Sequence, residues 1–280
     1  MSLIQSDVVR VFDKWALGIH HGPGDSVLVT GMNGEVVELD PELRERRRWQ
    51  AHEGSVNALR VVDGQVWTAG GDGAIRLWDG ATLEPLKTFR GPRKPVTSFF
   101  FSGCDLVAQS YERAVYLWPS DTPDTEPRKI AKVATLALTR HGPLGCPRTG
   151  SKAGDIGPLA PLDLASGRFG GPIFDDGFAA WAVQDVAGRG VVAFGLDLQA
   201  VTLDLEAGTR TPLGWHSKSG PPSFVALSGG GDIMFGDGQI YHQGNRQAAP
   251  VKGLYCAIQL LDGRVAFAGA DGQIWVFEAA

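Results

Sequence analysis

The chain has 280 residues, of which 43% are hydrophobic and 20% are charged. No stretch approaches the roughly 20 apolar residues of a membrane helix, and the N-terminus lacks the basic and apolar regions of a signal peptide. We therefore expect a soluble, cytoplasmic protein without a membrane partner. The net charge of −5, from 26 basic and 31 acidic residues, gives no general field for nucleic acid.

The three cysteines, Cys104, Cys146 and Cys256, lie far apart and form no CxxC pair. An odd number of cysteines without metal-ligand spacing argues against a disulfide framework and against a zinc module.

In chain order, the predicted elements begin with a strand at residues 7–12 and a hairpin of residues 27–30 and 36–40. The clearest unit follows, from Ser55 to Phe89. Its four short β-prone segments, separated by turns rich in Gly and Asp, are residues 56–61, 66–70, 75–79 and 85–89. This pattern predicts a small antiparallel meander.

The middle hairpin of this unit returns along the chain. The later copies join residues 105–110 to 114–118, 191–194 to 200–204, 233–235 to 239–242, and 265–268 to 274–277. Asn-Gly or Asp-Gly between two apolar runs predicts a type I′ turn, which needs two positive φ angles. We expect such turns at Asn33-Gly34, Asp72-Gly73, Asp237-Gly238 and Asp271-Gly272. Trp78, Trp118 and Trp275 are predicted to occupy one matching position in their units.

The units number seven if residues 133–172 form a degenerate one. Within it, the Gly- and Pro-rich stretch 142–161 shows no clear hairpin, and we expect an enlarged loop there. The last unit, residues 254–278, has only three segments. The N-terminal segment 7–12 can supply its fourth strand, and this pairing would close a ring without open edges.

The Ser55–Phe89 unit resembles a WD repeat, and the chain is similar to seven-bladed WD-repeat β-propellers. The resemblance implies an all-β fold of four-stranded antiparallel blades, in one domain over residues 1–280. In this family a His, a Ser or Thr, a turn Asp and a third-strand Trp form a hydrogen-bonded chain. His52, Thr68, Asp72 and Trp78 fill these positions here. The other blades depart from the pattern.

No arrangement of residues predicts catalysis. His52, Asp72 and Thr68 could be mistaken for a catalytic triad, but a buried imidazole between a carboxylate and a hydroxyl satisfies all three groups structurally. Residues 145–152 lack the spacing of a phosphate loop. The histidines show no metal spacing. We therefore expect no catalytic residues, no metal and no cofactor.

One dense basic segment, residues 44–48, falls where the outer strand of the first blade is expected. Charged outer strands protect a sheet edge from further pairing. The alternative is a docking patch for an acidic partner or nucleic acid, which salt-dependent binding would reveal.

In the WD-repeat family, the loops that enter each first strand and those between second and third strands line the face that binds partners. Carried over to this sequence, that rule predicts a partner-binding surface. Its residues are Trp15, Arg93, Lys94, Tyr111, Asp176 and Lys218. Aromatic and Arg side chains in exposed loops are types enriched at binding hot spots.

The resemblance implies a non-catalytic scaffold or adaptor, monomeric by itself, that holds one or more protein partners. Stand-alone bacterial propellers of this type occur with signalling, protease or defence modules. The alternative is a ligand-binding or enzymatic propeller that uses its central channel. The first strands offer Asn57, Thr97 and Gln259 for that role, but no repeated Asp, Glu or His.

Overall fold

The computed structural model describes residues 3–119, 126–152, 154–217, 221–243, 245–251 and 253–279. These residues form strands and turns and contain no helix, so the all-β prediction is confirmed. The chain folds as two compact units. The first combines residues 1–98 with 223–280, and the second is residues 99–222.

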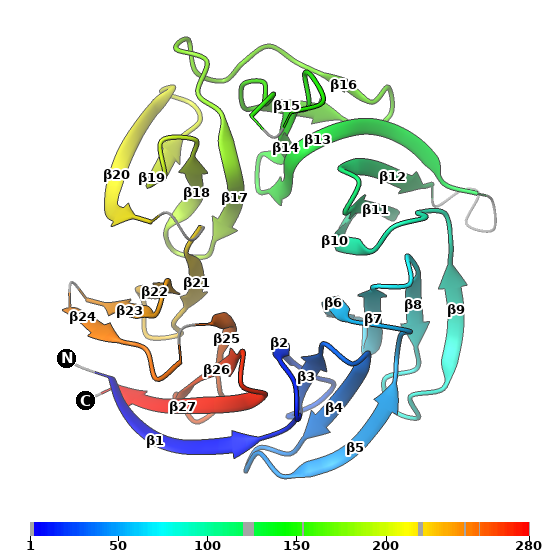
Figure 1. Cartoon of the computed structure of the whole chain (residues 1–280), viewed down its shortest axis with the longest axis vertical. Coiled ribbons are helices and arrows are strands. Elements are labelled where there is room, and N and C mark those ends of the chain that lie inside the picture. Colours follow the sequence, from blue (N-terminus) through cyan, green and yellow to red (C-terminus); the bar gives the residue numbers. More distant parts are fainter. Residues whose placement is uncertain are drawn as a thin grey trace. The chain divides into compact units, whose positions relative to one another are not determined.

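The described residues of the first unit form four antiparallel sheets of four strands each (Figure 1). One sheet consists of β2 (Ala16–His21), β3 (Val27–Gly31), β4 (Glu35–Leu39) and β5 (Glu45–Gln50), and the next of β6 (Val56–Val62), β7 (Gln65–Gly70), β8 (Ile75–Trp78) and β9 (Pro85–Phe89). A third consists of β21 (Ser223–Ala226), β22 (Asp232–Gly236), β23 (Gln239–His242) and β24 (Asn245–Ala248). The last consists of β25 (Leu254–Gln259), β26 (Val265–Gly269), β27 (Gln273–Ala279) and β1 (Leu3–Arg10). The sheet β6–β9 is the predicted meander.

The first strand of the chain completes the sheet of the last strands. β1 pairs antiparallel with β27, with Leu3 opposite Ala279 and Arg10 opposite Gln273 (Figure 1). The strand begins at Leu3, earlier than the predicted residue 7. Gln247 in β24 fixes its start, because its side-chain amide exchanges hydrogen bonds with the Leu3 backbone at 3.1 and 3.2 Å.

In the second unit, the residues that the structure describes form a seven-stranded sheet and a four-stranded sheet. The seven-stranded sheet consists of β10 (Val96–Ser102), β11 (Asp105–Ser110), β12 (Ala114–Trp118), β13 (Arg128–Thr139), β14 (Gly142–Pro147), β15 (Ala160–Asp163) and β16 (Arg168–Phe169). The first residues of β10 belong to the first unit. The four-stranded sheet consists of β17 (Ala180–Val186), β18 (Gly190–Gly195), β19 (Gln199–Asp204) and β20 (Thr209–His216).

The seven-stranded sheet arises because β13 has 12 residues and serves two sheets in succession. Its first half pairs with β12 and its second half with β14. The expectation that residues 142–161 hold no clear hairpin was wrong for β14, which pairs with β13 on one side and β15 on the other. The residues after it, up to β15, carry the long connection.

The type I′ prediction is correct at Asp237-Gly238, where φ is 49° and 68°. It was wrong at the other three turns, where only Gly34, Gly73 and Gly272 have positive φ. In these turns the Asn or Asp side chain accepts the backbone amide two residues later, at 3.1–3.3 Å. The turns are therefore longer loops that end on a left-handed residue.

Trp275 does not occupy the position predicted for it. Trp78 lies opposite Val66, and the equivalent residue opposite Val265 is Phe277. Trp275 instead corresponds to Arg76 of the sheet β6–β9, two residues nearer the turn than the position of Trp78. There its indole Nε1 donates to Asp271 at 3.2 Å, much as Arg76 donates to Asp72 at 2.7 Å.

The core of the first unit consists of apolar layers between neighbouring sheets. Ile19 and Val29 pack with Ile258 and Ile274 of the last sheet. On the other side, Leu28 belongs to the layer that includes Val56 and Trp78. Because the inner strands are buried in this way, the accessible surface consists of the outer strands, the strand ends and their turns.

Candidate interaction site

His52 lies at the centre of a hydrogen-bonded network of the four predicted residues. Its Nδ1 is 2.9 Å from Asp72 Oδ1, and its Nε2 is 2.9 Å from Thr68 Oγ1. The Trp78 indole donates to the same hydroxyl at 2.9 Å. With a neutral imidazole, Trp78 donates to Thr68, Thr68 to His52, and His52 to Asp72, so that each donor has an acceptor.

The charges in this network favour a neutral histidine and an ionised aspartate. Burial lowers the pKa of His52, although the neighbouring Asp72 acts in the opposite direction. Burial alone would raise the pKa of Asp72, but hydrogen bonds from His52, Arg76 and the Ala74 amide lower it to about 2. The imidazole is packed against the backbone, because a Cβ at Gly70 would lie 2.2 Å from its ring. The His52 side chain is 0% exposed, so the imidazole is not open to solvent.

Trp15 is the first of the predicted partner-binding residues, and it belongs to an exposed apolar cluster. It lies between β1 and β2 and remains 45% exposed. Its ring packs against Tyr255 of β25, with ring centroids 5.8 Å apart. The Met32 amide donates to the Trp15 carbonyl at 3.0 Å, and the Met32 side chain is also exposed. We call Trp15, Met32 and Tyr255 the Trp15 patch.

Three further predicted residues are exposed in the loops expected for them. Arg93 and Lys94 lie between β9 and β10. Tyr111 begins the loop between β11 and β12 and is 72% exposed. An aromatic side chain this exposed leaves apolar surface in water that a partner could cover.

Asp176 is exposed, but an ion pair within the chain already engages its carboxylate. Both of its oxygens accept hydrogen bonds from Arg210, at 3.0 and 2.5 Å. The Arg210 guanidinium in turn lies 4.3 Å from the centroid of the Phe178 ring. Asp176 therefore orders its own loop. Lys218 lies outside the described residues.

The sequence analysis missed Met32 and Tyr255. Met32, Tyr111 and Leu196 each stand one position before the Asn, Glu or Asp of the loop between the second and third strands. All three are exposed. Aligning the units on their turn residues would therefore have found Met32 and Leu196. Tyr255 carries no such signal, because only its contact with Trp15 brings it into the patch.

Residues 45–48 of the basic segment lie in the outer strand β5, as predicted, and Arg46, Arg47 and Arg48 have acidic partners in the chain. Arg47 binds Glu38 at 2.5 Å. Arg48 binds Glu35 and Glu45 at 3.0 and 2.7 Å. Arg46 lies 3.6 Å from Asp25. Because Arg47 and Arg48 form close pairs with Glu38, Glu35 and Glu45, much of the positive charge of this strand is compensated within the chain. This favours a protected sheet edge over a nucleic-acid site.

The polar residues considered for a channel site are largely used by the fold. Asn57 donates to the Val96 carbonyl at 2.8 Å. Gln259 accepts the Ser228 amide at 2.6 Å and donates to Gly263 at 3.1 Å. Within the described residues, no three His, Cys, Asp or Glu side chains gather in a way that could hold a metal ion. Among the described residues, none forms a helix that is long and apolar enough to cross a membrane.

Two comparisons with known proteins agree with this architecture. A model of the family "WD domain, G-beta repeat" matches residues 43–79, which include all four members of the His52 network. Among solved structures, the chain is similar to the WD40 beta propeller domain of Doa1, with a TM-score of 0.71 and 12% sequence identity. The alignment covers 100% of this chain and 97% of that one. No curated protein matches the sequence. The resemblance to WD-repeat propellers is thus confirmed for one repeat and for the fold.

Proposed function

We propose that this chain, which carries a WD repeat and has a fold similar to WD40 propellers, is a non-catalytic protein-interaction module. WD40 propellers generally act as scaffolds for protein assembly. In this proposal the chain is a scaffold or adaptor subunit, monomeric by itself, and holds a protein partner in a larger cytoplasmic assembly.

The Trp15 patch is the observation that carries this proposal. Aromatic side chains and Met are enriched at the centres of protein interfaces, because they bury a large apolar area on binding. Trp15 and Tyr255 are held against each other, and a backbone hydrogen bond ties Met32 to Trp15. Such a fixed arrangement loses little conformational entropy when a partner binds.

In the proposed architecture, residues 1–280 form one propeller of seven blades. The count of seven treats β13 as the outer strand of one blade and the inner strand of the next. The degenerate blade then covers residues 133–172. The pairing of β1 with β27 supports a ring closed by the N-terminal strand.

The experiment is quantitative affinity purification of the tagged protein from its native host, with mass spectrometry. The wild-type protein is compared with Trp15→Ser and Tyr111→Ser. A matched control is Leu86→Ser, which removes an apolar side chain of similar exposure from the outer strand β9. We expect a partner in stoichiometric amounts with the wild type and the control. Its recovery should fall at least about tenfold with Trp15→Ser, the loss typical of a hot-spot residue.

Two results would contradict the proposal. One is the absence of any stoichiometric protein under gentle conditions. The other is a partner whose recovery is the same with all variants, which would place the contact away from these loops. Circular dichroism of each variant verifies that the fold is retained.

A further inference from the structure

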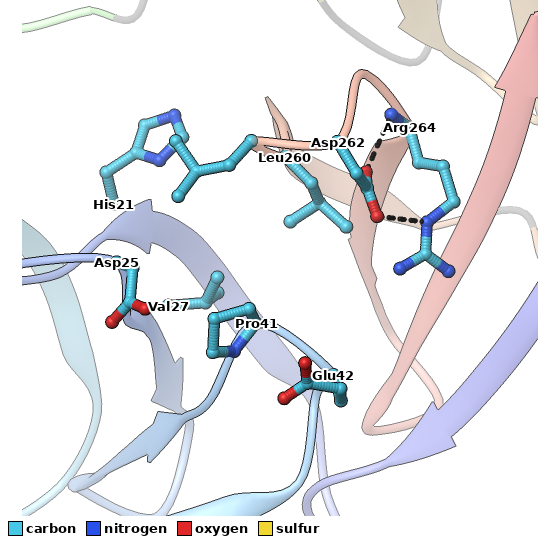
Figure 2. Close-up of a pocket in the computed structure, with 9 residues that line it drawn as sticks. His21, Asp25, Val27, Pro41, Glu42, Leu260, Asp262 and Arg264 are labelled. Atoms are coloured by element: carbon cyan, nitrogen blue, oxygen red, sulfur yellow. Dashed lines mark hydrogen bonds and ion pairs between the residues drawn. The ribbon is translucent and has the colours of Figure 1, made fainter.

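A cavity lies at the opposite end of the strands that carry the Trp15 patch. Trp15 precedes β2 and Tyr255 is near the start of β25, whereas the cavity is built where these two strands end. His21 is the last residue of β2, and Leu260 directly follows β25. The cavity has a volume of about 260 Å³. Figure 2 shows its walls, which come from the turns after β2 and β4 on one side and the turn after β25 on the other.

Each of these turns is closed by its own hydrogen bonds. The Gly22 amide donates to the Ser26 carbonyl at 2.8 Å, and the Asp40 amide to the Arg44 carbonyl at 2.9 Å. In the third turn, the Leu260 amide donates to the Arg264 carbonyl at 2.7 Å. The walls are therefore formed before any ligand arrives, which lowers the entropy cost of binding.

The interior of the cavity is apolar. Val27, Pro41 and Leu260 line it (Figure 2). Leu261 also lines it and is 73% exposed, more than any other large apolar side chain in the described residues. Because a well-ordered turn presents this leucine to water, burying it against a ligand would release apolar surface from solvent.

The rim of the cavity is acidic. Asp25 and Glu42 stand on one side (Figure 2). On the other, Asp262 accepts the Arg264 backbone amide at 3.0 Å and its guanidinium Nε at 2.7 Å, so the charges of these two side chains compensate each other. A neighbouring hollow shares Asp262 and Arg264 and adds the acidic Glu278. Arg46 lies 3.6 Å from Asp25, but both side chains are exposed, so this contact neutralises little.

The size and charge of the cavity limit what it can hold. Ligand pockets for whole small molecules are typically about 300–1,000 Å³, so this volume suits one or two side chains. Carboxylates at the rim repel phosphates and nucleic acid. A purely charged polyamine would leave the apolar interior uncovered.

We propose that this cavity binds a peptide segment of a protein partner, in which one apolar side chain is flanked by basic residues. The apolar side chain enters the cavity and covers Leu261, and the basic side chains lie near Asp25, Glu42 and Glu278. The site is separate from the Trp15 patch and does not depend on it.

The test is fluorescence anisotropy with a set of labelled, end-capped octapeptides. Each has Leu, Ile, Val, Met or Phe at one central position, with Lys or Arg on both sides and Gly or Ser elsewhere. One matched set replaces the apolar residue by Ala, and another replaces the basic residues by Glu. We expect members of the first set to bind at 0.15 M salt, the Ala peptides about tenfold more weakly, and the Glu peptides not measurably.

Variants of the protein locate the binding. Leu261→Ser and Glu42→Lys should each weaken the best peptide about tenfold. Leu86→Ser and Trp15→Ser should leave its affinity unchanged. Leu261 and Glu42 are both exposed, so their replacement spares the core. The inference is overturned if no peptide of the first set binds, if the Ala peptides bind equally well, or if neither cavity variant weakens binding. Since Trp15→Ser is the variant that tests the partner surface, the two proposals can fail separately.

Discussion

Asp72 is the residue on which the contacts of the His52 network converge. Its carboxylate accepts hydrogen bonds from His52, Arg76 and the Ala74 amide. The Asp72 side chain is only 10% exposed, so water cannot replace these partners. A short polar side chain in a turn thus connects β7, β8 and the segment that precedes β6.

Replacing Asp72 tests whether this network stabilises the fold. We expect Asp72→Ala to lower the free energy of unfolding by about 2–4 kcal/mol, because it leaves a buried imidazole and a guanidinium without their acceptor. Asp72→Asn, which keeps one acceptor, should lose less. The measurement is urea denaturation, with the exposed Asp175→Ala as control. An unchanged midpoint for Asp72→Ala would remove the network from any account of stability.

His20 predicts how stability depends on pH. Burial, with smaller contributions from Arg60 and His21, lowers the pKa of His20 from 6.5 to about 4. Below pH 6.5 the unfolded chain binds a proton that the folded chain does not accept until about pH 4, so stability falls as the pH decreases through this window. His20→Gln should lose less stability between pH 7.5 and 4.5 than the wild type, as measured by urea midpoints. Parallel curves for the two proteins would contradict this assignment.

At the scale of the elements, the outer strand β5 shows how a charged sequence fits a sheet edge. Alternate residues of a strand point to opposite sides. Here Arg47 faces Glu38 of the neighbouring strand β4, directly opposite it in the register. The Glu38 side chain is 6% exposed, and Arg47 is the partner that compensates its charge. The edge strand therefore contributes to stability as well as blocking further pairing.

Arg47 and its neighbour provide a matched comparison. Arg47→Ala should lower the free energy of unfolding by about 1–3 kcal/mol, because it leaves a buried carboxylate without its partner. Arg46→Ala breaks an exposed ion pair and should change it by less than about 0.5 kcal/mol. Thermal or urea denaturation measures both. Equal effects would mean that Glu38 has another source of compensation.

For the whole molecule, most of the hairpins that the sequence predicted have turns marked by Asp, Asn or Gly. The hairpin of β11 and β12, whose turn is residues 111–113, was predicted from its similarity to the others. The strand β14 was missed because Gly142, Pro143 and Gly145 have low strand propensity, and its neighbours β13 and β15 hold it in the sheet. Trp275 was matched to Trp78 by residue type. Counting residues from the preceding turn, which sets the register, gives Phe277 as the equivalent of Trp78.

The candidate surface was predictable only in part, for a related reason. The loop rule carried over from the WD-repeat family identified exposed loops, and so it found Trp15 and Tyr111. It gave no information on contacts between distant segments. The Trp15–Tyr255 contact, the Asp176–Arg210 ion pair and the cavity beside Leu260 each join residues that the fold alone brings together.

The pairing of β1 with β27 also determines how the molecule responds to mechanical force. Leu3 and Ala279 face each other at one end of the pair, and Arg10 and Gln273 at the other (Figure 1). Because the strands are antiparallel, a force on Leu3 and Ala279 acts at one end of the pair and loads the hydrogen bonds at that end first. A pull applied at Leu3 and Ala279 would open this pair first and then break the remaining bonds one after another. The β1–β27 pair is thus arranged to peel apart when it is pulled at this end rather than to resist the pull.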